Sequence, residues 1–202
     1  MADSDRSNGY DEIAAGFIAA RSRNGLRIGA DVVAAWSQQL PRGSSVLDLG
    51  CGNGIPISQT LIEQGLQVYG VDASPALVAD FRSRFPRVPV ECAGVEDSDF
   101  FAKRFDGVVS WGLIFLLDEG TQRRLISKIA SALCPGGRLL FTAPHQVCAW
   151  NDVLTGRSSR SLGFQEYRRV LQSEGLRLVG SQADEGENHY FLAEKGERPE
   201  SG

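Results

Sequence analysis

The chain has 202 residues, of which 42% are hydrophobic and 23% are charged, and its formal net charge is −4. These values are ordinary for one soluble globular domain that is long enough to bury a sizeable core. They argue against a nucleic-acid-binding protein, which needs a basic face to hold phosphates. No stretch approaches the roughly 18 apolar residues of a membrane span, so no membrane partner is expected.

The cysteine pattern and the first residues indicate the compartment. No Cys-x-x-Cys pair occurs, so we expect four reduced thiols and a cytoplasmic protein. Residues 1–9 are polar and lack the apolar stretch of a signal peptide, which agrees with that expectation. The four cysteines are Cys51, Cys92, Cys134 and Cys148.

The sequence of the first part of the chain predicts a terminal segment followed by a helix, a strand and a second helix. Residues 1–25 are expected to be partly disordered and to include a possible lid. Apolar residues at helical spacing predict a helix over 26–40, which ends at a Pro-Arg-Gly sequence. A strand over 45–49 and a helix over 56–64 follow, and Gly65 is a suitable residue just beyond that helix.

The middle of the chain continues the alternation of strands and helices. A strand is predicted over 67–71, and Ser74 followed by Pro75 is typical of a capped helix start, with the helix reaching 84. Further strands are predicted over 88–92 and 105–111, with a weakly helical stretch over 98–103 between them.

The last part of the chain has two further helices and three strands. Helices are predicted over 119–133 and 164–174. Residues 145–163 show little periodicity and are interpreted as an irregular insertion, and residues 196–202 as a disordered tail. The strands are predicted over residues 138–143, 176–180 and 190–194.

This alternation predicts an α/β fold, a Rossmann-like doubly wound sheet of seven strands. No helix separates the last two strands, so the last strand must run antiparallel to its neighbours while the others are mostly parallel.

The most informative motif is the sequence Asp48-Leu49-Gly50-Cys51-Gly52-Asn53-Gly54 at the end of the first predicted strand. Three glycines in five residues indicate a sharp turn that a ligand approaches closely. The next strand ends at Asp72, 18 residues after Gly54. A strand, a glycine turn, a helix, a second strand and an acid together bind a nucleoside-bearing cofactor, whose ribose hydroxyls the acid holds.

This motif resembles the first motif of class I S-adenosylmethionine-dependent methyltransferases, and residues 68–74 (Val-Tyr-Gly-Val-Asp-Ala-Ser) stand at the expected distance from it. The resemblance implies a methyltransferase domain over 26–195, with S-adenosylmethionine as cofactor and a small-molecule acceptor bearing an O, N or S nucleophile. The resemblance leaves open a non-catalytic domain that binds the cofactor or a partner. An NAD-dependent oxidoreductase is disfavoured, because Ile55 stands where the dinucleotide fingerprint has its last glycine.

The resemblance also implies which residues bind the cofactor. Asp48 would steady the methionine ammonium, Asp72 the ribose, and the loop after the third strand the adenine. Many relatives have an Asp after the glycine of that loop, and this chain has Val95 there instead, so the adenine contact is open. The implied cofactor residues are Asp48, Gly50, Cys51, Gly52, Gly54, Asp72, Ala73, Ser74, Gly94, Val95, Glu96, Ser110 and Trp111.

The two histidines, His145 and His189, both follow or begin strands at the expected ligand edge, so each is a candidate general base or acceptor-binding group. Each is equally well explained as a hydrogen-bonded loop residue. The acceptor pocket is expected between residues 10–27 and 147–163, where aromatic residues beside arginines favour an aromatic or anionic acceptor. No cluster has metal-ligand spacing, so no metal site is predicted.

Overall fold

A computed structural model describes residues 5–23, 27–184 and 186–197 of the chain. Seven strands form one sheet in the order β3-β2-β1-β4-β5-β9-β8. All neighbours are parallel except β9, which runs antiparallel to both β5 and β8. This confirms the predicted seven-stranded sheet with its last strand reversed. The strands are β1 (Ser45–Leu49), β2 (Gln67–Asp72), β3 (Val90–Cys92), β4 (Phe105–Ser110), β5 (Leu133–Thr142), β8 (Leu176–Ala183) and β9 (His189–Lys195).

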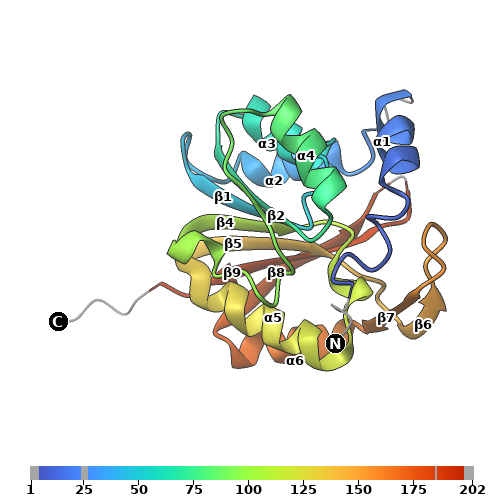
Figure 1. The fold of residues 1–202 in the computed structure, drawn as a ribbon. Coiled ribbons are helices and arrows are strands. Elements are labelled where there is room, and N and C mark those ends of the chain that lie inside the picture. Colours follow the sequence, from blue (N-terminus) through green and yellow to red (C-terminus); the bar gives the residue numbers. More distant parts are fainter. Residues whose placement is uncertain (1–4, 24–26, 185, 198–202) are drawn as a thin grey trace.

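Helices cover both faces of the sheet, as Figure 1 shows. On one face lie α2 (Ala30–Ser37), α3 (Ile57–Glu63) and α4 (Pro75–Arg84), and on the other lie α5 (Glu119–Ala132) and α6 (Phe164–Ser173). An additional helix, α1 (Ala14–Arg23), lies beside α4 near the end of the sheet where the parallel strands finish.

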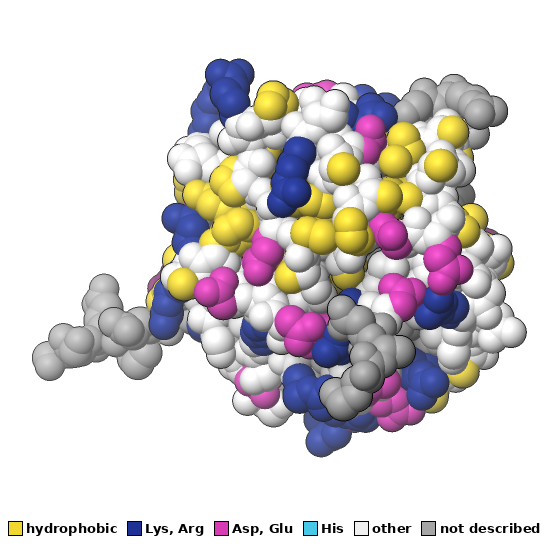
Figure 2. Space-filling view, viewed as in Figure 1, with side chains coloured by type: hydrophobic (Ala, Val, Ile, Leu, Met, Phe, Trp, Pro, Cys, Tyr) yellow, Lys and Arg dark blue, Asp and Glu magenta, His cyan; other side chains and the backbone are white. Residues whose placement is uncertain are grey.

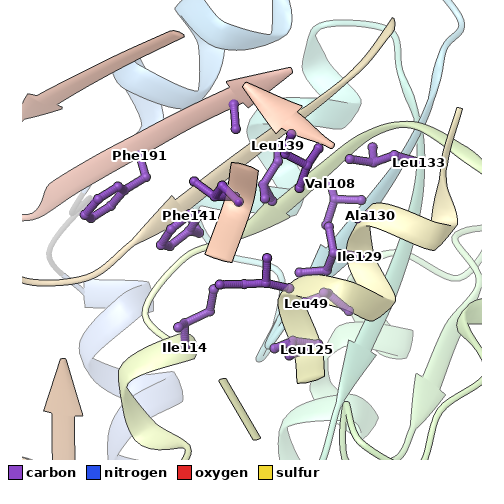
Figure 3. Packing of buried hydrophobic residues seen from close by; sticks show 14 of the residues in the cluster. Leu49, Val108, Ile114, Leu125, Ile129, Ala130, Leu133, Leu139, Phe141 and Phe191 are labelled. Carbon is purple, nitrogen blue, oxygen red and sulfur yellow. The ribbon is translucent and has the colours of Figure 1, made fainter. Parts of the chain in front are cut away.

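Alternate strand residues feed two hydrophobic clusters, because successive side chains of a strand point to opposite faces. Val46 packs with Trp36 and Leu61 of α2 and α3, whereas Leu47 belongs to the cluster that contains α5 and α6. Figure 3 shows part of the second cluster, where Ile129 of α5 lies against strand residues such as Val108 and Leu139. The two cores hold the sheet rigid and so fix the positions of its loops.

Several element bounds differ from the predictions. The helix predicted from 26 begins at Ala30, preceded by Gly29 with a φ of 84°. The weakly helical stretch reduces to a 3₁₀ turn, η1 (Phe100–Ala102), whose residues have left-handed φ values and therefore cannot continue as an α-helix. Residues 1–4, 24–26 and 198–202, where part of the predicted disorder falls, lie outside the described residues.

The expectation of an irregular insertion over 145–163 was wrong. This segment forms an antiparallel hairpin of β6 (Val147–Asn151) and β7 (Ser158–Leu162), which projects from the sheet in Figure 1. Asp152 makes its turn, because its Oδ1 accepts bonds from the Leu154 and Thr155 backbone nitrogens at 2.9 and 2.8 Å. Neither strand alternates apolar with polar residues, because β6 (Val-Cys-Ala-Trp-Asn) is mostly apolar and β7 (Ser-Ser-Arg-Ser-Leu) is mostly polar, so no strand pattern is visible in the sequence.

The surface in Figure 2 carries lysine and arginine side chains mingled with aspartate and glutamate side chains.

None of the helices in the described part of the chain is both long enough and apolar enough to span a bilayer.

Candidate active site

A cavity of ≈ 340 Å³ lies where the parallel strands β1, β2 and β4 end, with residues 6–10 and the β6–β7 turn forming its outer walls. Ligands of open α/β sheets bind at this edge. Nine of the predicted cofactor residues line it, namely Asp48, Gly50, Cys51, Gly52, Asp72, Ala73, Val95, Glu96 and Trp111.

The glycine turn is held by its own backbone and by Asp72. Gly50 and Cys51 donate to the Val71 carbonyl at 2.8 and 3.2 Å, and Gly54 donates to the Cys51 carbonyl at 2.9 Å. The Gly52 nitrogen donates to Asp72 Oδ2 at 2.8 Å. The φ values of 71°, 53° and 83° at the three glycines explain why side chains are avoided there. These bonds leave few N–H groups of the turn for a ligand.

Asp72 joins the turn to α4, because its second oxygen accepts from the Ser74 nitrogen at 2.9 Å. Burial raises the pKa of Asp72, and the backbone bonds from Ser74 and Gly52 oppose that rise. Each carboxylate oxygen has a second lone pair and is therefore able to accept a further bond from a ligand hydroxyl.

Asp48 is only 1% exposed and receives a bond from Ser58 Oγ at 2.6 Å. Burial, followed by the nearby charge of Asp72, raises the pKa of Asp48 to about 7, while the Ser58 bond lowers it. An isolated buried carboxylate is costly, so an acid in this position favours a cationic partner. Ser58 was missed by sequence reasoning, although its place in the first turn of α3 directs it back toward β1.

Comparison with known proteins points to one family. Residues 46–137, which include the glycine turn and Asp72, match a family model described as "Methyltransferase domain". Over this part of its length the chain is similar to methyltransferase domains. These residues span β1 to the start of β5, the half of the sheet that forms the cavity.

Related proteins agree with this assignment. A ubiquinone biosynthesis O-methyltransferase of Coxiella burnetii is 30% identical over 105 residues, which cover 50% of this chain and 44% of that protein. The chain therefore spans about half the length of the curated relatives it matches. One of these relatives is a probable S-adenosylmethionine-dependent methyltransferase of Mycolicibacterium smegmatis, 27% identical over 139 residues that cover 67% of this chain and 53% of that protein.

Solved structures show the same fold. Magnesium protoporphyrin IX methyltransferase from Synechocystis with bound S-adenosylmethionine has a TM-score of 0.72 at 18% identity, covering 97% of this chain and 100% of that chain. A Burkholderia thailandensis methyltransferase with bound 1,6-didemethyltoxoflavin and S-adenosylhomocysteine has a TM-score of 0.71 at 21% identity, covering 98% and 92% of the two chains.

Four predicted cofactor residues do not line the cavity. Gly54 faces Phe81 and Phe85, and Ser74 caps α4 by accepting from the Leu77 nitrogen at 3.2 Å. Gly94 lies against Arg6, and the buried Ser110 Oγ has no hydrogen-bond partner among the described residues. Gly54 and Ser74 therefore pack behind the residues that line the cavity and do not face it themselves.

The two histidines lie together but outside the cavity lining, and both come after the residues that match the family model. Their rings stack with centroids 4.5 Å apart, and His145 Nε2 is 2.6 Å from Ser181 Oγ. Burial, followed by the neighbouring His189, lowers the pKa of His145. His145 also packs on Phe191 and Phe164, with ring centroids 5.2 Å apart in each case, as a structural residue does. The candidate-base role stays a prediction.

We expect His145→Ala and His189→Ala to leave both the dissociation constant of S-adenosylhomocysteine and the turnover number within about twofold of the wild type. The physical reason is their position outside the cavity lining. Calorimetry and a radiolabelled methyl-transfer assay measure the two quantities. A turnover loss above tenfold with unchanged affinity in either variant would restore the histidine base.

Trp111 lies in a hydrogen-bonded chain. Its Nε1 donates to Tyr190 Oη at 2.8 Å, and Tyr190 Oη donates to Asp184 Oδ2 at 2.7 Å. Tyr190 is fully buried, so this chain fixes the orientation of the Trp111 ring in the cavity wall. Trp111 therefore both packs the sheet edge and faces the cavity.

Arg21 of α1 also lines the cavity and was missed by sequence reasoning. Its guanidinium carbon is 5.0 Å from the ring centroids of both Phe17 and Trp111. Burial lowers the pKa of Arg21, and within the described residues no carboxylate forms an ion pair with it. The other basic residue of the lining, Arg6, is paired with Glu96 at 3.1 Å.

The segment 5–12, which we call the strap, closes the outer side of the cavity. Asp11 Oδ1 accepts from Ser74 Oγ at 2.6 Å, and Tyr10 Oη donates to Asp152 of the hairpin turn at 3.3 Å. Arg157 of the hairpin pairs with Asp5 and Glu12 at 3.0 and 2.8 Å. These contacts join parts of the chain between 63 and more than 140 residues apart, which no local pattern predicts.

Proposed function

We propose that this chain transfers the methyl group of S-adenosylmethionine to a small-molecule acceptor. The observation that carries the proposal is the Asp72 carboxylate, which braces the glycine turn and also borders the cavity. Support comes from the match to the methyltransferase family model over the same residues. A cytoplasmic location, with neither nucleic acid nor membrane as partner, belongs to the same proposal and agrees with the four free cysteines.

The cavity residues fit this cofactor. Asp72 would accept the ribose hydroxyls, Asp48 would face the methionine ammonium, and Val95 and Glu96 would border the adenine. When bound, S-adenosylmethionine supplies a methyl group on a positively charged sulfur, which an acceptor atom displaces in line. The Trp111 ring, held by Tyr190, offers a cation–π surface to that charge.

Arg21 would bind the methionine carboxylate. The glycine turn offers few hydrogen-bond donors to that carboxylate. Its N–H groups already donate to acceptors within the protein at Gly50, Cys51, Gly52 and Gly54. A partly buried guanidinium without a carboxylate partner is the strongest available site for it. We therefore assign this role to Arg21.

We expect Arg21→Met to weaken binding of S-adenosylhomocysteine at least tenfold and to leave 5′-methylthioadenosine unaffected. The second ligand shares the nucleoside and lacks the amino acid, so it has no carboxylate to lose. Calorimetric titration of wild type and variant with both ligands measures this. Equal weakening of the two ligands contradicts the carboxylate role.

The raised pKa of Asp48 predicts that cofactor affinity depends on pH. The folded value is about 7, so the carboxylate that pairs with the ammonium is formed only above that pH. S-adenosylhomocysteine should therefore bind more tightly as the pH rises from about 6 to 8, whereas Asp48→Asn should bind weakly with a flat profile. Asp48 also makes the stability of the unliganded protein depend on pH. As the pH rises from 3.8 to about 7, the free energy of unfolding falls, because the carboxyl group loses its proton in the unfolded chain while the folded protein still holds it. A wild-type affinity that falls over the same range refutes the assignment.

The acceptor half of the cavity is apolar. Leu116 and Leu117 follow Phe115, which packs on Trp150 of the hairpin with ring centroids 5.5 Å apart. Val153 at the hairpin turn is 93% exposed although it borders the cavity. This lining favours a hydrophobic, ring-containing acceptor, and the related toxoflavin enzyme with its bound 1,6-didemethyltoxoflavin supports that class.

Calorimetric titration of the purified protein with S-adenosylmethionine, and with NAD as control, tests the proposal. We expect micromolar binding of S-adenosylmethionine alone. Binding of NAD instead would identify an oxidoreductase and refute the proposal. Binding of S-adenosylmethionine without turnover on any ring-containing acceptor of a panel would favour a non-catalytic cofactor-binding domain.

A further inference from the structure

Asn8 carries an unused hydrogen-bond donor in the wall of the cavity. Its side-chain nitrogen Nδ2 is buried and has no hydrogen-bond partner within the part of the chain that the structure describes. Asn8 is also one of the cavity-lining residues. Buried amide groups are nearly always hydrogen-bonded, so a donor left over beside a cavity points to a ligand atom as its partner.

The strap backbone is built without help from the Asn8 side chain. Asp5 accepts bonds from Ser7 N at 2.9 Å, Ser7 Oγ at 2.6 Å and Gly9 N at 2.9 Å. Asn8 itself has a left-handed φ of 51°, which this turn imposes and which asparagine adopts more readily than other side chains, though less readily than glycine. The turn therefore accounts for the backbone conformation and leaves the amide without a structural task.

The strap is anchored on both sides of Asn8 to the loops that border the proposed nucleoside site. Before Asn8, Arg6 pairs with Glu96 at 3.1 Å, in the loop that follows β3. After Asn8, Asp11 accepts from Ser74 Oγ at 2.6 Å and from the Ala76 nitrogen at 3.0 Å, directly after Asp72 and β2. The chain between these anchors crosses the ends of β2 and β3, which places Asn8 over the ribose and adenine rather than over the methionine.

We propose that the Asn8 side-chain amide donates a hydrogen bond to the adenosine part of the cofactor, so that the strap selects the nucleoside. This inference rests on the proposed function. The partner is a hydrogen-bond acceptor of the nucleoside, a ring nitrogen or a ribose oxygen.

Asn8→Gly is the decisive variant, because glycine keeps the left-handed turn without strain and removes only the amide. We expect about tenfold weaker binding of both S-adenosylhomocysteine and 5′-methylthioadenosine, with an unchanged or higher melting temperature. Asn8→Asp, which has the same shape but no donor, should weaken both ligands at least as much. Ala102→Gly is the matched control, since Ala102 also has a left-handed φ, of 48°, and does not line the cavity.

The outcomes separate this inference from the proposed function. Wild-type affinity for both ligands in Asn8→Gly would show that asparagine is present only for the turn, and would overturn the inference while leaving the proposed function intact. Weakening of S-adenosylhomocysteine alone would move the contact to the methionine part and overturn the nucleoside assignment. Failure of the wild type to bind either ligand would overturn the proposed function itself, and the inference with it.

Discussion

Asp72→Ala is expected to weaken S-adenosylhomocysteine binding at least tenfold, about 1.4 kcal/mol. The variant loses the proposed acceptor for the ribose hydroxyls. It also frees the Gly52 and Ser74 nitrogens, which Asp72 now holds at 2.8 and 2.9 Å, so the glycine turn loses its brace. Calorimetric titration at neutral pH measures the effect directly.

A matched control exists at the opposite end of the strands, where β1 and β4 begin. Asp106 also accepts a bond from a backbone nitrogen, that of Ser45, at 2.8 Å, and it does not line the cavity. Asp106→Ala should lower the melting temperature and leave ligand affinity unchanged. If the two variants change affinity equally, or if Asp72→Ala binds as tightly as the wild type, the ribose assignment is wrong.

Gly54→Ala should destabilise the fold by ~3 kcal/mol, through backbone strain and overpacking together. A methyl group at this position would lie 2.5 Å from the Phe85 ring and 3.0 Å from Phe81, and the φ of 83° disfavours any side chain. Because both rings pack behind the turn, relief requires α4 to move away from β1. Urea unfolding followed by circular dichroism gives the free energy of unfolding.

Gly43→Ala separates the two causes. Gly43 has a φ of 82° with no atom within 4 Å of the added methyl group, so this variant carries the backbone strain without the clash. It should cost about 1–2 kcal/mol. Equal losses in the two variants would mean that the contact with Phe81 and Phe85 contributes nothing to the requirement for glycine at position 54.

The candidate site divides into parts that sequence reasoning found and parts that it missed. The glycine turn and Asp72 were predictable, because a strand, a turn and a helix that are consecutive in the chain fix their relative positions locally. Arg21, Asn8 and Ser58 were not. Their role depends on which segment folds back over the turn, and no period or spacing in the sequence encodes that contact.

The histidines show how far an edge of the sheet predicts a cavity lining. Both were placed correctly at the edge where the strands begin or end. Neither lines the cavity, although Asn188, which directly precedes His189, does. Their rings stack on each other instead, and the direction in which a side chain points at the edge is set by packing that the alternation of elements does not reveal.

The sequence by itself determined the α/β class, the reversed last strand, and the glycine turn with its acid, since each depends on residues close together in the chain. The sequence indicated a possible lid within residues 1–25, but only the tertiary structure decided which contacts anchor the strap over the cavity. Only the tertiary structure decided, too, that residues 147–162 form a hairpin and that Arg21 lies between Phe17 and Trp111. Those features rest on contacts such as that of Arg157 with Asp5 and Glu12, between segments that meet only after the sheet has assembled.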